Sequence, residues 1–171
     1  MTGSGKTTLA RRLGELTGIP WHEADQLTWE PGWVQVSDEE QRARIQAICD
    51  QDEWILDTAY GKWVEIPLAR AELIVALDYP RWVSLGWLIK RTLARATDRE
   101  PVCNGNQESW KIMFSRDSIL LWHFKSFRRK RARILVWKSG GVEADVMHFT
   151  HPNQVARWLA SLDRATQPVG E

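Results

Sequence analysis

The stretch TGSGKTT at residues 2–8 decides how the rest of the chain is interpreted. In a phosphate-binding loop of the form G-x-x-x-x-G-K-[ST], glycines let backbone N–H groups close around a polyphosphate, and the lysine reaches its terminal phosphates. The hydroxyl group that follows the lysine ligates Mg²⁺. Gly3, Gly5, Lys6 and Thr7 supply most of this pattern. We therefore expect this stretch to bind a polyphosphate.

The residues after the loop have the pattern of an amphipathic helix. Leu9, Leu13 and Leu16 recur at helical spacing within residues 8–16, so the loop should end at a helix N-terminus. Free N–H groups and the helix dipole favour an anion there. The positions expected to line the phosphates are Gly3, Ser4, Gly5, Lys6, Thr7 and Thr8.

The loop motif lacks its first glycine. Counted back from Gly5, that glycine falls one position before Met1, and the strand that normally precedes such a loop would lie upstream. We expect the natural protein to start about ten residues earlier, the length of one strand with its turn. Without that strand its neighbours lose hydrogen-bond partners, so the chain should be poorly stable and bind nucleotide weakly. The alternative, a flexible Ser/Gly-rich tail, fits poorly with the helix that follows directly.

Length and composition restrict the class of protein. A chain of 171 residues can form one domain with a substantial core. Its 23 basic and 22 acidic side chains give a formal charge of +1, so no global field attracts nucleic acid or a membrane. Cys49 and Cys103 form neither a disulfide framework nor a metal-ligand pattern. With no apolar segment near the ~20 residues that span a bilayer, we expect a cytoplasmic protein.

Short apolar runs alternate with helical segments along the rest of the chain. Runs of this length suit strands that are buried on both faces, and their alternation with helices predicts an α/β layer architecture with a central parallel sheet. The expected strands are residues 19–22, 54–57, 73–78, 133–137 and 146–149, and the expected helices are residues 8–16, 37–49, 81–96, about 110–131 and from Pro152 onward.

Charged residues stand at the ends of these elements. Asp25 follows the first expected strand and Asp57 ends the second, at the edge where open α/β sheets bind ligands. A carboxylate there can equally cap a helix or form a turn. Arg91, Arg95 and Arg99 follow one another at intervals of four, which on a helix makes one cationic stripe suited to phosphates or, alternatively, a solvated face.

In this order, the pieces resemble the adenylate-kinase-like P-loop kinases, and in particular the small bacterial proteins labelled DNA topology modulation proteins. The resemblance covers roughly residues 2–160. It is carried by GSGKTTLARRL, HEADQLTWEPGW, WILDTAY, LIVALDYPRW and WHFKSFRRKRAR. It implies a three-layer P-loop fold over residues 1–164 with an arginine-bearing helical lid at about 91–116. We expect residues 165–171 to form a frayed tail.

The resemblance also implies roles for single residues. Lys6 would hold the β and γ phosphates of ATP, Thr7 would ligate Mg²⁺, and Asp57 would orient the water ligands of the metal. Asp25 resembles the carboxylate that faces the phosphoryl acceptor. Arg91 and Arg95 resemble lid arginines, and Asp78 would be structural. The family pattern D-G-F-P-R is D-T-A-Y at residues 57–60, so a nucleotide acceptor is not implied.

These observations predict a Mg²⁺·ATP-dependent kinase that phosphorylates a small molecule, which the sequence does not identify. Two alternatives stay open. One is an ATP-binding switch protein without a small acceptor. The other is nucleic-acid binding through a basic cluster, since six cations in nine positions could hold a phosphate backbone. The cluster consists of Lys125, Arg128, Arg129, Lys130, Arg131 and Arg133.

Overall fold

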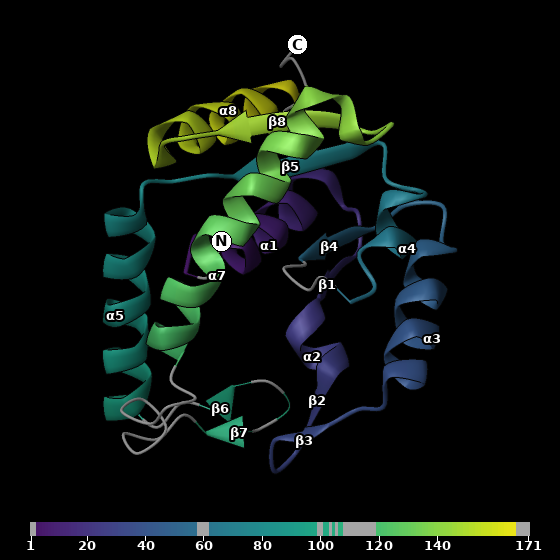
Figure 1. The fold of residues 1–171 in the computed structure, drawn as a ribbon. Helices are drawn as coiled ribbons and strands as arrows, with labels where there is room; N and C mark the ends of the chain where they lie inside the picture. Colours follow the sequence, from purple (N-terminus) through teal and green to yellow (C-terminus); the bar gives the residue numbers. More distant parts are fainter. Residues whose placement is uncertain are drawn as a thin grey trace.

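The computed structural model describes residues 3–57, 62–98, 101–102, 104, 106–107 and 119–166, which form a mixed α/β structure (Figure 1). The helices are α1 (Lys6–Thr17), α2 (Ala24–Thr28), α3 (Asp38–Cys49), α4 (Glu65–Leu68), α5 (Arg81–Asp98), α7 (Ile119–Val136), the π-helical turn η1 (Trp137–Gly141) and α8 (Pro152–Thr166). The strands are β1 (Trp21–Glu23), β2 (Trp29–Glu30), β3 (Val34–Gln35), β4 (Ile55–Asp57), β5 (Leu73–Leu77), β6 (Pro101–Val102), β7 (Asn106–Gln107) and β8 (Asp145–Phe149).

The expected parallel strands form two separate pairs. β1 pairs with β4, with Glu23 opposite Asp57, and β5 pairs with β8, with Leu77 opposite Phe149. Both pairs are parallel, as predicted. Within the described residues no ladder joins the pairs, so the single central sheet that we expected is seen as two short sheets.

Helix α1 links the two pairs by packing. It contacts β1 and β4 of one pair, and it also contacts α8, which packs on β8 (Figure 1). Leu9 of α1 is buried in one apolar cluster with Leu77 and Phe149 from the other pair. The Phe149 ring lies 5.4 Å from the ring of Trp158 on α8. The core thus runs from α1 across the β5–β8 pair to α8.

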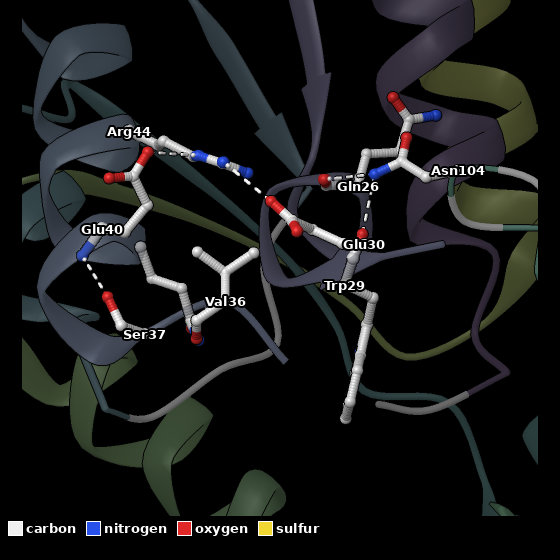
Figure 2. Close-up of polar contacts among 9 residues, drawn as sticks. Gln26, Trp29, Glu30, Val36, Ser37, Glu40, Arg44 and Asn104 are labelled. Carbon is white, nitrogen blue, oxygen red and sulfur yellow. Dashed lines mark hydrogen bonds and ion pairs between the residues drawn. The ribbon is translucent and has the colours of Figure 1, made fainter. Parts of the chain in front are cut away.

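A second core lies among α2, α3 and α4. The buried residues of α3 are Gln41, Ile45, Ile48 and Cys49. The helix begins as its S-x-x-E pattern indicates, because Ser37 Oγ accepts a hydrogen bond of 3.1 Å from the Glu40 N–H (Figure 2). The Glu40 side chain does not reach back to Ser37; it accepts from Arg44 Nε at 2.9 Å.

The predicted strand at residues 133–137 is wrong, because α7 continues to Val136 and η1 follows. A short apolar run cannot be assigned to strand or helix by periodicity alone, and no helix breaker separates it from the basic residues before it. Ile134 is buried whereas Leu135 and Val136 are exposed, the burial pattern of one helical face. The chain leaves the helix at Gly140, which has a left-handed φ of 91°.

Other predicted boundaries shift by smaller amounts. Helix α5 continues to Asp98, and its buried residues are Val83, Ser84, Leu88 and Thr92. Trp82, Ile89 and Leu93, three apolar residues of the same helix, are exposed. Residues 165 and 166, which we expected in the frayed tail, belong to α8. Residues 110–118 of the predicted long helix and residues 167–171 of the predicted tail lie outside the described residues.

Candidate phosphate-binding site

The glycines of the loop are required by its conformation and by close packing. Gly3 has a φ of 72° and Gly5, the N-cap of α1, a φ of 80°, both in the left-handed region. A Cβ atom on Gly3 would lie 2.6 Å from the carbonyl oxygen of Ser84 and 2.8 Å from Cβ of Leu88. The loop therefore lies directly on α5, and a larger residue than glycine does not fit at position 3.

The polar residues of the loop lie at the start of α1. Ser4 is buried, Lys6 and Thr7 are half-buried, and Thr8 is exposed. The first turn of α1 holds no acidic residue. No carboxylate of that turn therefore competes with an anion for the free N–H groups and the positive end of the helix dipole. The structure thus places the predicted phosphate-binding positions at a helix N-terminus, as expected.

Thr7 and Asp57, fifty positions apart in the sequence, meet in the structure. Asp57 ends β4, and its Oδ2 accepts a hydrogen bond from Thr7 Oγ1. The other carboxylate oxygen, Oδ1, is buried and has no hydrogen-bond partner among the described residues. A hydroxyl and a carboxylate beside a helix N-terminus form a donor set of the kind that Mg²⁺ uses together with phosphate oxygens.

Asp25 lies on the first turn of α2, two residues beyond the end of β1, and its side chain is exposed. Burial and three neighbouring cations lower the pKa of Lys130 on α7, and the negative charge of Asp25 opposes this lowering in small part. The carboxyl ends of the parallel strands β1 and β4 meet at one edge, where Glu23 lies opposite Asp57, and Asp25 follows Glu23 by two residues.

The predicted lid is described in part. Arg91 is exposed on α5, and Arg95 belongs to the same helix four positions later, with its side chain outside the described part. Most of residues 99–116 lie outside the described residues. Within that region Asn104 Nδ2 donates to the backbone oxygens of Gln26 and Trp29, at 2.9 and 2.7 Å (Figure 2). These bonds attach the predicted lid to the segment that follows Asp25.

Sequence analysis placed Lys130 in the basic cluster and gave it no role of its own. It comes from α7 and is only 8 % exposed. Burial, followed by the charges of Lys6, Arg133 and Arg129, lowers the pKa of Lys130 to about 8. Its sequence position inside a run of basic residues gave no signal, because neighbours in such a run look alike.

Asp78, at the end of β5, forms a different cluster. Its carboxylate is buried, and Oδ2 lies 3.3 Å from Arg131 Nε and 3.2 Å from His148 Nε2. Two groups that can carry positive charge therefore face one carboxylate. This arrangement agrees with the structural role expected for Asp78.

On another face of α7, an open hollow of about 430 Å³ lies between this helix and the start of α5. The guanidinium of Arg81 stacks over Phe127 at 4.6 Å and over Phe124 at 5.3 Å. Two members of the predicted basic cluster, Arg128 and Arg131, line this hollow, and Arg131 also pairs with Asp78. The hollow is lined by Arg81, Phe127, Arg128, Arg131, Ala132 and Leu135.

Across the described residues, no three His, Cys, Asp or Glu side chains converge as a metal-binding group. None of the helices in that part of the chain is both long and apolar enough to cross a membrane. Comparisons of the chain with models of protein families, with curated proteins and with solved structures give no match.

Proposed function

We propose that the protein binds Mg²⁺·ATP at residues 3–8 and transfers the terminal phosphoryl group to a small molecule. One observation carries the proposal: the hydroxyl of Thr7, next to Lys6 at the start of α1, is hydrogen-bonded to Asp57, a carboxylate with a second, unpaired buried oxygen in the described part of the chain. Hydroxyl, lysine, carboxylate and helix N-terminus are the groups that a phosphate-binding site for Mg²⁺·ATP requires.

The donor set fits Mg²⁺. This ion keeps several water ligands and is usually held by one or two carboxylates together with substrate phosphates, so few protein ligands are needed. Thr7 would hold the ion directly, and Asp57 would hold it through its water ligands. When bound, the ion would neutralise charge on the phosphates.

The remaining groups would position and neutralise the phosphates. Phosphoryl transfer asks a protein mainly for alignment of donor and acceptor and for stabilisation of charge. Lys6 and the α1 N–H groups would hold the terminal phosphates, and Arg91 and Arg95 would approach from α5. Asp25 would orient the hydroxyl group of the acceptor, because it lies at the same strand edge as Asp57 and is exposed to an incoming molecule.

The proposed fold is the three-layer P-loop fold, with the pairs β1–β4 and β5–β8 as two halves of one sheet. The support is that α1 packs against both halves, while β4 and β5 each have one strand neighbour in the described residues. One further parallel strand would pair with both. An N-terminal extension that carries an apolar strand should therefore raise both the thermal stability and the ATP affinity; unchanged values would contradict this fold.

The test of the kinase is ADP production that depends on an acceptor. Lys6→Ala should abolish ATP binding, while Asp25→Asn should keep ATP binding and lose most of the transfer. Lys62→Ala is the matched control, since Lys62 is an exposed lysine paired with Asp38. A Lys6→Ala protein that binds ATP as tightly as the wild type would refute the proposal. If Asp25→Asn is silent with every acceptor tried, the role of Asp25 is wrong.

A second candidate function, binding of single-stranded nucleic acid, is favoured by the hollow beside α7. Arginines and an aromatic ring share this surface, and such surfaces hold backbone phosphates and stacked bases. Binding of an oligonucleotide should weaken steeply with salt, and Arg128→Gln should reduce the salt dependence by about one counterion. Absence of binding at low salt would remove this candidate.

A further inference from the structure

Asn104 connects two segments that lie far apart in the sequence. Its Nδ2 donates hydrogen bonds to the backbone oxygens of Gln26 and Trp29, at 2.9 and 2.7 Å (Figure 2). Both partners are carbonyl oxygens, which only accept, so the atom that faces them has to be the NH₂ group of the amide. One side chain therefore uses both of its N–H donors on one short stretch of backbone, 78 and 75 positions away.

The backbone of Asn104 is suited to this contact. Asn104 lies between the antiparallel strands β6 and β7 and has a left-handed φ of 59°. Asparagine and aspartate adopt this conformation more readily than most other non-glycine residues. An aspartate would fit the same backbone, but its ionised carboxylate has no N–H to donate. The contact with α2 therefore requires the amide group and not merely a residue that tolerates the turn.

Helix α2, which carries Asp25, is held by contacts from outside itself. It has five residues, and so short a helix is not stable alone. The carbonyl groups at the end of a helix have no partner within it. The Thr28 oxygen accepts from the N–H of Val36 at 3.0 Å. The two oxygens that Asn104 binds belong to the third residue of the helix and to its C-cap. Val36 and Asn104 thus hold the C-terminal end of α2 together.

We propose that Asn104 is a positioning residue of the phosphoryl transfer: by holding the C-terminal end of α2, it sets the direction of the Asp25 carboxylate. Asp25 is exposed on the first turn of this helix, and the residue after it, Gln26, carries one of the bonded oxygens. The proposal rests on the proposed function, because the role of Asp25 is part of it.

The direction of Asp25 matters because of the reaction step. The hydroxyl oxygen of the acceptor forms a bond to the terminal phosphorus of ATP, the bond from this phosphorus to the bridging oxygen breaks, and its electron pair leaves with ADP. The hydroxyl proton passes to the Asp25 carboxylate and from there to solvent. A displacement of about 1 Å in such a group can cost about 100-fold in rate. Loss of the Asn104 bonds should therefore lower kcat, while the KM for ATP, which depends on residues 3–8, should stay the same.

The experiment measures ADP production from Mg²⁺·ATP by the full chain, in water alone and with glycerol or glucose as the hydroxyl acceptor. Asn104→Asp keeps the size of the side chain and its tolerance of a left-handed φ, and it loses both donated bonds. We expect kcat to fall about 10- to 100-fold, with the KM for ATP within about twofold of the wild-type value. Asn104→Gly, which keeps the left-handed φ without adding a charge, should show the same loss.

The matched control is Asn153→Asp, which makes the same chemical change at an exposed asparagine of α8 and should leave kcat and KM unchanged. Thermal unfolding shows that each variant folds. In a chain that already carries Asp25→Asn, Asn104→Asp should cause no further loss of kcat, because the carboxylate that Asn104 positions is gone. A purely structural role would lower kcat equally with and without Asp25→Asn.

Three outcomes would overturn this proposal and leave Mg²⁺·ATP binding and transfer standing: a wild-type kcat in Asn104→Asp, an equal loss with and without Asp25→Asn, or a silent Asp25→Asn. A wild-type chain that makes no ADP with water, glycerol or glucose would refute the proposed transfer, and the role of Asn104 would fall with it.

Discussion

The two parallel pairs end in carboxylates with opposite surroundings. Asp57 at the end of β4 accepts a hydrogen bond from the hydroxyl of Thr7, the residue next to Lys6 at the start of α1. Asp78 at the end of β5 is buried against Arg131 and His148. Each carboxylate has one buried oxygen without a hydrogen-bond partner among the described residues. The other oxygen of Asp78 faces two groups that can carry positive charge, whereas that of Asp57 accepts from a neutral hydroxyl beside a helix N-terminus. We therefore propose that the first cluster stabilises the fold and that the second holds an added metal ion.

Replacing Asp78 should have the largest effect on stability. Asp78→Ala leaves the half-buried ring of His148 and the guanidinium of Arg131 without their acceptor, so we expect the free energy of unfolding to fall by about 3 kcal/mol. Chemical denaturation measures it. The control is Asp50→Ala, which removes an exposed carboxylate paired with Arg70 and should cost less than about 1 kcal/mol. Equal losses in the two variants would contradict a stabilising role for the Asp78 cluster.

Replacing Asp57 should instead affect ligand binding. Asp57→Asn keeps the shape of the side chain and its acceptor for Thr7 but removes the charge that would orient the metal's water ligands. We expect the gain in ATP affinity on adding Mg²⁺ to fall about 10- to 100-fold, with little change in stability. Titrations with and without Mg²⁺ measure this gain. A variant that keeps the full Mg²⁺ effect would show that Asp57 does not act on the metal.

The sequence could not distinguish these two carboxylates, because each follows a short apolar run in the same way. Their difference depends on partners far along the chain, Thr7 for one and Arg131 with His148 for the other, and no local pattern reveals such pairings. Helix α3 was predictable because its cap and its buried face are encoded within a few residues. The end of α7 was not, since a short apolar run fits a strand or a helix equally well.

The pH dependence of stability should reveal the burial of Lys130. The pKa of Lys130 is about 8 in the folded protein and 10.5 without perturbation, so the unfolded chain binds more protons between these values. The free energy of unfolding should therefore rise by about 3 kcal/mol as the pH increases through this window, and below pH 8 the destabilisation by the buried charge should be present in full. Lys130→Met should flatten this rise. An equal rise in wild type and variant would show that another group is responsible.

The smallest expected effect is a coupling energy. We compare the coupling between Thr7 and Asp57, which lie in one site, with the coupling between Asp57 and His148, which lie in different clusters. Thr7→Val removes the hydroxyl that contacts Asp57. If both residues act on one metal ion, Thr7→Val and Asp57→Asn should be non-additive in Mg²⁺-dependent ATP affinity, by about 0.5–3 kcal/mol. Thr7→Ser, which keeps the hydroxyl, should show no such coupling.

His148 belongs to the other cluster, so the effects of His148→Gln and Asp57→Asn should add to within about 0.5 kcal/mol. Strong coupling between His148 and Asp57 would mean that the two carboxylate clusters form one functional unit, which their separate sets of partners argue against.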